Sequence, residues 1–214
     1  MSLSPKFLDP YISKTPPWGF NGLGYIVYKR TYARITDDGQ TEEWWQTCQR
    51  VVDGANAIGA ELTKDEAERL FDYMFNLKGL PGGRMLWQLG TPNNFRLGGD
   101  SLCNCWFVDI QKPEDFAWMF ERLMLGGGVG FSILHPQRLG IVRQGVVTNH
   151  NVPDADYIAP DKREGWSECL LRAMKTYLGD KDDPTELTYS TEMIRPAGAP
   201  IKTFGGTASG PGIL

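Results

Sequence analysis

The sequence predicts an α/β fold, with a helical N-terminal region over residues 1–79 and an α/β region over residues 80–214. Two patterns support this prediction. Apolar residues recur at helical spacing between residues 41 and 79, whereas short apolar runs alternate with helical segments after Gly79. With 41% hydrophobic and 22% charged residues, a chain of 214 residues can bury a sizeable core, so we expect one or two ordinary globular domains.

The N-terminal region divides into an arm and two helices. Proline and glycine recur through residues 1–24, which predicts a mostly irregular arm, and residues 24–35 fit either an extended segment or a helix. Apolar spacing predicts a first long helix from about Thr41. The capping-box pattern of residues 63–66 predicts a second helix, which should end at Gly79.

The α/β region follows from a change of pattern after Gly79. Its expected elements are, in order, a glycine turn with a short strand (80–90), a strand (101–110), a helix from Pro113, a strand (128–134), a polar insertion (136–160), a helix (161–178) and a strand (186–191). This order is typical of α/β proteins. The glycine-rich tail, residues 201–214, fits either an anion-binding loop or a flexible terminus.

Composition narrows the classes of function. The formal net charge of −4, with no basic run, argues against binding to nucleic acid or to an anionic membrane. No apolar stretch approaches the roughly 20 residues that span a bilayer, and the N-terminus lacks a signal-peptide hydrophobic region, so we expect a cytoplasmic protein. The two histidines, His135 and His150, are too few to favour a zinc site or a Ser-His-acid triad, so no metal site is predicted.

The four cysteines, Cys48, Cys103, Cys105 and Cys169, are expected to be free or redox-active thiols, because nothing indicates secretion. Cys103 and Cys105 fall in an apolar run that is typical of a buried strand, where both would point to the same face. Their Cα atoms would then lie roughly 6.5 to 7 Å apart, which makes them poor disulfide partners. From the residues alone, each is interpreted as an ordinary buried cysteine with no local cause to become a thiolate.

Three consecutive glycines, residues 126–128, stand between the predicted helix from Pro113 and the following strand. A helix end explains one of them. The others fit a place where the main chain approaches a ligand closely. The spacing is not that of a dinucleotide-binding G-x-G-x-x-G, so a Rossmann site is rejected.

A set of motifs occurs in order along nearly the whole chain: YKRTYAR, GGRMLWQLGT, GDSLCNCWFV, LMLGGGVGFS, DKREGW and IRPAGAPIKTFGGTASGP. In these motifs the chain resembles the adenosylcobalamin-dependent (class II) ribonucleotide reductases, of the monomeric ribonucleoside-triphosphate type. The resemblance implies that the α/β region is the first part of a ten-stranded α/β barrel, incomplete in this chain. It also implies that residues 134–140 begin the region that binds a possible deoxynucleotide effector.

The resemblance assigns roles to particular residues. Cys105, in the NCW motif, would be the catalytic thiol on the reductant side, and Gly83, Asn104 and Gly128 would border the ribonucleotide substrate. In this family a thiyl radical on a different cysteine abstracts the ribose 3′ hydrogen. The NCW cysteine and a third cysteine then supply reducing equivalents as the 2′ hydroxyl leaves as water. Cys103 is interpreted as a tolerated neighbour.

The family's radical-bearing finger loop would come well after FGGTASGP. The chain is therefore expected to be the N-terminal part of a reductase, split or processed, that is inactive without a C-terminal reductase chain. That part would bind most of the adenosylcobalamin, and a dithiol such as thioredoxin would be the reductant. Two alternatives remain: a non-catalytic nucleotide-binding or assembly module of the same fold, and a stand-alone thiol oxidoreductase using Cys103 and Cys105. The last is disfavoured because no C-x-x-C begins a helix.

Overall fold

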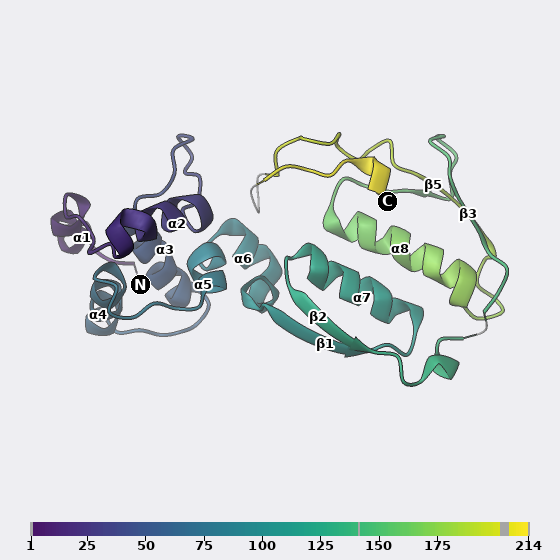
Figure 1. The fold of residues 1–214 in the computed structure, drawn as a ribbon, viewed down its shortest axis with the longest axis horizontal. Helices are drawn as coiled ribbons and strands as arrows, with labels where there is room; N and C mark the ends of the chain where they lie inside the picture. Colours follow the sequence, from purple (N-terminus) through teal and green to yellow (C-terminus); the bar gives the residue numbers. More distant parts are fainter. Residues whose placement is uncertain (1, 141, 202–205, 214) are drawn as a thin grey trace. The chain divides into compact units, whose positions relative to one another are not determined.

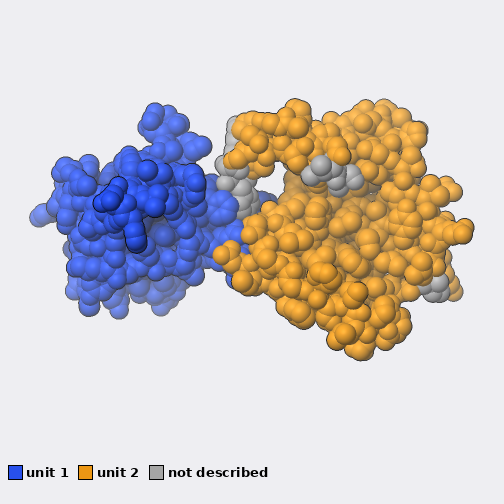
Figure 2. Space-filling model, in the orientation of Figure 1, with its two compact units in different colours: residues 1–103 blue, residues 104–214 orange. Residues whose placement is uncertain are grey.

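The computed structural model describes residues 2–140, 142–201 and 206–213. The chain forms two compact units, residues 1–103 and 104–214 (Figure 2). In the described residues, the first unit has helices, turns and an isolated β-bridge between Ile35 and Thr41, whereas the second combines helices with parallel strands. The predicted mixture of helices and strands is therefore confirmed. No helix among the described residues has both the length and the apolar character needed to cross a bilayer.

The first unit is built from short helices (Figure 1). They are α1 (Pro5–Ile12), η1 (Phe20–Gly22), α2 (Leu23–Thr31), α3 (Trp44–Ala57), α4 (Lys64–Phe75), α5 (Gly83–Gln88), α6 (Pro92–Leu97) and η2 (Gly98–Leu102), where η marks a 3-10 helix. The capping box before α4 is confirmed, since the Thr63 hydroxyl accepts a hydrogen bond from the Glu66 N–H. This helix ends at Phe75, earlier than the predicted end at Gly79.

Two sequence predictions for this unit were wrong. The supposed irregular arm contains α1, because Ser4 caps the helix through its side chain, Pro5 occupies the first turn and Leu8 is buried. The supposed strand near residues 80–90 is the helix α5. A short apolar run cannot be assigned to strand or helix by periodicity alone, and here tertiary contacts to its carbonyl groups favour the helix.

The core of the first unit lies mainly between α3 and α4. Its most buried side chains are Cys48, Val52, Phe71, Met74 and Phe75, all at most 1% exposed. Cys48 lies on the buried side of α3. The backbones of two segments also touch, because a Cβ added at Gly54 of α3 would lie 2.6 Å from the Gly90 Cα after α5.

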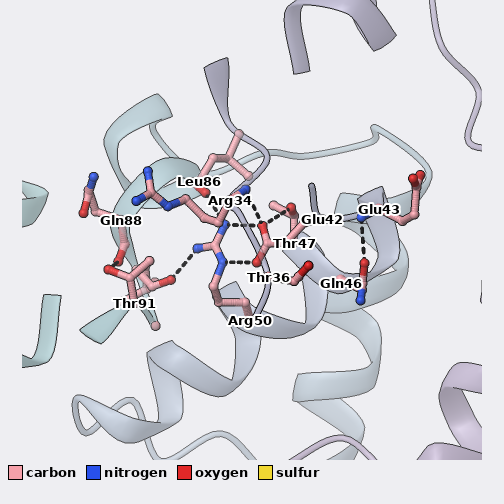
Figure 3. Close-up of polar contacts among 12 residues, drawn as sticks. Arg34, Thr36, Glu42, Glu43, Gln46, Thr47, Arg50, Leu86, Gln88 and Thr91 are labelled. Atoms are coloured by element: carbon pink, nitrogen blue, oxygen red, sulfur yellow. Dashed lines mark hydrogen bonds and ion pairs between the residues drawn. The ribbon is translucent and has the colours of Figure 1, made fainter. Parts of the chain in front are cut away.

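Arg50 of α3 forms a buried ion pair with Glu42 and also holds the end of α5 through hydrogen bonds (Figure 3). Arg50 of α3 donates from Nε and Nη2 to the two carboxylate oxygens of Glu42, at 2.7 and 3.0 Å. The same guanidinium donates to the carbonyl groups of Leu86 and Leu89, at 2.9 and 2.6 Å. Glu42 also accepts a hydrogen bond from the Thr47 hydroxyl at 2.7 Å. This network fixes the end of α5 relative to α3.

The second unit contains β1 (Cys105–Asp109), α7 (Pro113–Met124), β2 (Gly128–Ser132), η3 (Pro136–Arg138), β3 (Val146–Asn149), β4 (Tyr157–Ile158), α8 (Arg163–Leu178), β5 (Glu186–Ser190) and η4 (Pro211–Ile213). The predicted helix from Pro113, the helix within 161–178 and the strands near 128 and 186 are confirmed. The polar insertion of residues 136–160 also carries two short strands, β3 and β4, which the sequence did not predict.

The strands of this unit form two small parallel sheets in the described residues, β1–β2 and β3–β5–β4. The helices α7 and α8 pack side by side (Figure 1), with a hydrogen bond from the Ser167 hydroxyl to the Ala117 carbonyl at 3.3 Å and an ion pair between Lys175 and Glu114 at 2.7 Å. The ten-stranded barrel stays a prediction.

Candidate functional site

The site is built on the strand–helix–strand segment β1–α7–β2 of the second unit. The two strands pair in parallel, with Cys105 opposite Gly128 and Phe107 opposite Gly130. Trp106 contacts Trp118 of α7 edge to face, with ring centroids 5.7 Å apart, so the Trp106 side of β1 faces the helix. Because successive residues of a strand point to opposite faces, Cys105 and Phe107 point away from α7. We call this surface, formed by Cys105, Phe107, Gly128 and Gly130, the open face.

The open face differs from the buried strand that the sequence predicted for residues 101–110. Cys105 is exposed, and Phe107 is 68% exposed. The strand also begins later than expected, at Cys105, because residues 98–102 form the 3-10 helix η2. Cys103 follows η2 and precedes the β1–β2 ladder, so the two cysteines do not share one strand.

The four cysteines fall into two classes. Cys103 and Cys105 are exposed, whereas Cys48 and Cys169 are buried. Burial raises the pKa of the Cys169 thiol to about 11, and burial raises the pKa of Cys48 further still. The two buried thiols therefore stay protonated at neutral pH, and accessible thiol chemistry is concentrated in Cys103 and Cys105.

Two of the predicted substrate neighbours lie directly beside Cys105. The Gly128 N–H donates to the Asn104 carbonyl at 2.7 Å, which starts the ladder between the two strands. A Cβ added at Gly128 would meet nothing closer than that carbonyl oxygen, at 3.8 Å. Packing within the described chain therefore does not require a glycine at this position.

The neighbouring glycines of the same loop have reasons within the fold. Gly126 adopts a left-handed conformation with φ of +77°, which ends α7. A Cβ at Gly127 would lie 2.9 Å from the Trp106 ring and 3.0 Å from the Arg122 carbonyl. Of the three consecutive glycines, only Gly128 has neither a left-handed backbone nor a close contact that explains it.

Gly83, the other predicted neighbour of the substrate, is the first residue of α5 and belongs to the first unit, whereas Cys105 belongs to the second. A Cβ there would lie 3.0 Å from the Tyr32 hydroxyl. This close approach gives Gly83 a structural reason that Gly128 lacks. The structure thus brings together Asn104, Cys105 and Gly128 within the second unit.

Two features of the site were missed as candidates from the sequence. Phe107 shares the open face with Cys105, which the two-residue period of a strand could have indicated. On the opposite face, the Arg122 guanidinium lies 5.1 Å from the ring centroids of both Trp106 and Trp118. Its cation–π contacts hold the strand and the helix together behind the open face.

The arrangement favours one kind of chemistry. An accessible thiol stands opposite bare glycine backbone, with one aromatic ring two residues along the strand. A flat molecule lying on the open face could approach the backbone at Gly128 and contact the Cys105 sulfur. A thiol in this position is suited to electron and hydrogen transfer to such a molecule.

Comparisons with known proteins show which family the chain resembles over nearly its whole length. Residues 3–91 match the family described as ribonucleotide reductase alpha domain, and residues 137–214 match the B12-dependent ribonucleotide reductase insertion domain. Cys105 and Gly128 lie between these two ranges.

Among curated proteins, the chain is 38% identical to an adenosylcobalamin-dependent ribonucleoside-triphosphate reductase of Euglena gracilis, over 99% of the chain and 31% of the relative. It is 37% identical to the corresponding protein of Lactobacillus leichmannii, over 99% of the chain and 36% of the relative. A crystal structure of a B12-dependent (class II) ribonucleotide reductase superposes with a TM-score of 0.78 and 33% identity, covering 99% of this chain and 38% of that one. The chain thus spans about a third of the length of the curated relatives.

Proposed function

Because this chain belongs to the B12-dependent ribonucleotide reductase family, we propose that it forms the N-terminal part of an enzyme that converts ribonucleotides to deoxyribonucleotides by thiyl-radical chemistry. Cys105 is the reductant-side thiol in this proposal. The observation that carries it is the exposed Cys105 sulfur at the head of β1, directly opposite the open position of Gly128.

Two thiols supply the electrons and protons that the proposed reaction needs. A ribonucleotide takes two electrons and two protons from Cys105 and a third cysteine, and the ribose 2′ hydroxyl leaves as water. The two sulfurs are oxidised to a disulfide, which an external dithiol such as thioredoxin reduces for the next turnover. The exposure of Cys105 supports this role, because a thiol that alternates between substrate and reductant must be reachable by both.

The substrate is proposed to lie on the open face. Gly128 would let the nucleotide approach the main chain, since a side chain there would occupy its space. Asn104 would border the substrate next to Cys105. Gly83 remains a third proposed neighbour, although a side chain there would also come within 3.0 Å of the Tyr32 hydroxyl. A deoxynucleotide effector, bound by a region that begins at residues 134–140, is a further part of the proposal.

The residues of the open face do not fit a corrin ring, because they are one thiol, one aromatic ring and glycine backbone. The proposal therefore assigns adenosylcobalamin, on which the named relatives depend, mainly to the part of the reductase outside this chain. The same part would carry the cysteine that becomes the thiyl radical. In a split enzyme it would be a separate C-terminal chain, and turnover would require both.

The test is Cys105→Ser in the complete reductase that contains this chain. Deoxynucleotide formation over many turnovers should be lost, because serine cannot enter a disulfide. Exchange of the adenosylcobalamin 5′ hydrogens should persist, since hydrogen abstraction belongs to another cysteine. Cys169→Ala serves as the matched control, because it removes a buried thiol. Full deoxynucleotide formation by the Cys105→Ser enzyme would overturn the assignment and favour a non-catalytic module.

A further inference from the structure

The first unit carries an exposed apolar surface on α2 and on the short turn η1 that precedes it (Figure 1). We call this surface the α2 patch, and its members are Phe20, Leu23, Ile26 and Val27, all exposed. Residues three and four apart share one side of a helix, so Leu23, Ile26 and Val27 form one continuous face of α2. A contiguous apolar patch on a protein surface marks a place of interaction, whereas single exposed apolar residues do not.

The other side of α2 already packs in the core of the first unit. Tyr28 is buried, its ring stacks on that of Trp18 with centroids 5.5 Å apart, and its hydroxyl donates a hydrogen bond to the Glu42 carbonyl at 2.8 Å. A helix at a protein surface usually buries one apolar side and turns a polar side to the solvent. Because α2 is apolar on both sides, it is typical of a helix that is covered on both.

The turn before α2 presents Phe20 at the cost of an unfavourable backbone. Phe20, Asn21 and Gly22 have φ angles of +58°, +52° and +88°, and only the glycine adopts this left-handed region freely. Phe20 is 88% exposed, so packing within the described chain does not compensate for this conformation. Residues held in such backbone conformations cluster where a protein binds a ligand or a partner.

The charge beside the patch indicates the chemistry of its partner. Arg30 lies one turn after Ile26, is exposed and forms no ion pair among the described residues, whereas Lys29 pairs with Glu43 at 2.6 Å. Residues 20–31 contain no acidic residue. Two copies of the chain that met through this patch would therefore bring positive charges together without a carboxylate between them. A different surface, apolar with a carboxylate at its rim, is complementary to the patch.

We propose that the α2 patch is the docking surface for the part of the reductase that lies outside this chain. The inference rests on the proposed function, in which that part completes the enzyme. This chain covers 31% of one curated relative and 36% of another, so the larger part of these relatives has no counterpart in it. In the docked state, apolar side chains of that part cover Phe20 and the exposed face of α2, and a carboxylate pairs with Arg30.

Hydroxyl-radical labelling tests the docking, because the radicals oxidise side chains that are exposed to solvent. Oxidation of Phe20 and Ile26 is measured by peptide mass spectrometry in this chain alone and in the complete reductase that contains it. Labelling of Phe20 should fall about ten-fold in the complete reductase, since the centre of an interface is packed like a protein interior. Equal labelling of Phe20 and Ile26 in the two proteins would overturn the proposal.

Matched variants of the complete reductase separate the patch from other apolar residues. Ile26→Gln should restore much of the labelling of Phe20, because a polar side chain is costly to bury in an apolar interface. Arg30→Glu should act in the same direction, since it would face the partner's carboxylate with a like charge. Ile58→Gln is the control, because it changes a similarly exposed isoleucine of the same unit outside the patch and should leave Phe20 protected. Equal effects of Ile26→Gln and Ile58→Gln would contradict a specific docking surface.

Two comparisons distinguish this inference from its alternatives. If sedimentation shows that the isolated chain self-associates and Phe20 becomes protected only as it does so, the occupant is a second copy and the proposal is wrong. Labelling does not depend on catalysis, so it is independent of the test of Cys105. Protection of Phe20 in an enzyme that is fully active with Cys105→Ser would support the docking and refute the role of the thiol. An unprotected Phe20 in an enzyme that requires Cys105 would refute the docking alone.

Discussion

Replacing Glu42 by Gln should destabilise the first unit strongly, because it removes the charge that balances Arg50. The side chains of Glu42 and Arg50 are only 7% and 12% exposed, and two hydrogen bonds join them. Glutamine keeps the size of the side chain, so the change leaves a largely buried guanidinium without a counter-charge. Arg50 would still hold the carbonyl groups of Leu86 and Leu89.

The magnitude follows from the burial of the pair. Removing one partner of a buried ion pair costs about 3–5 kcal/mol, compared with about 0–1 kcal/mol for an exposed pair. For a unit of about 100 residues, each kcal/mol lowers the midpoint temperature by about 4–8 °C, so the loss should be about 12 °C or more. Glu68→Gln is the matched control, because it breaks a more exposed pair, with Lys64, in which the side chains of Lys64 and Glu68 are 68% and 27% exposed and the charged atoms are 3.8 Å apart.

The pH dependence of the free energy of unfolding is a second test of the ion pair between Glu42 and Arg50. Burial alone would raise the pKa of Glu42, but the hydrogen bonds and charge of Arg50, together with Thr47 and the Arg34 N–H, hold this pKa below its usual value. A carboxylate whose pKa is lowered in the folded state contributes stability above its unfolded pKa, about 4.3, and loses it as the pH falls through the folded value. The stability difference between the two proteins should therefore be full at pH 7 and shrink in acid.

Urea unfolding followed by tryptophan fluorescence measures the free energy, and amide hydrogen exchange localises the change to α3 and α5. The double variant Glu42→Gln with Arg50→Met should recover part of the loss, because it removes both charges. A loss below about 1 kcal/mol for Glu42→Gln, equal to that of the exposed control, would refute the view that this pair is a buried support of α5.

Two further predictions concern the second unit and its thiols. Gly127→Ala should lower the free energy of unfolding by about 1–3 kcal/mol, because its Cβ would overlap the Trp106 ring. Gly128→Ala should leave the thermal unfolding temperature nearly unchanged. Equal losses of stability in the two variants would show that Gly128 too is structural. Iodoacetamide at pH 7 should alkylate Cys103 and Cys105 in the folded chain, whereas Cys48 and Cys169 should react only after denaturation. Peptide mass spectrometry would identify the modified residues. Rapid modification of Cys169 would contradict its burial and its raised pKa.

The sequence predicted those elements that have strong local signals. Residues 63–66 cap α4 as expected, and Pro113 begins α7, because caps and proline act within a few residues of the chain. The helix α1 was missed although Ser4 and Pro5 gave a start signal, since the density of proline and glycine outweighed it. The helix α5 was missed because the contacts that stabilise it come from Arg50, far away in the sequence.

The candidate site was predictable only in part. Alternation along β1 puts Cys105 and Phe107 on one side, but an apolar run does not reveal which side is covered, and the covered side proved to be that of Trp106. The pairing of Cys105 with Gly128 depends on strand register, which is a tertiary property. Cys103 was placed on the strand because nothing local indicated that η2 would end just before it.

The open space at Gly128 also has an evolutionary consequence. A glycine that packing does not require is free to drift to alanine or serine without cost to folding, whereas Gly127 beside it is held by the Trp106 ring. We therefore expect the residues that relatives carry at these two positions to reflect two different selective pressures. At position 127 the variation should follow the demands of the fold, and at position 128 it should follow those of the proposed substrate.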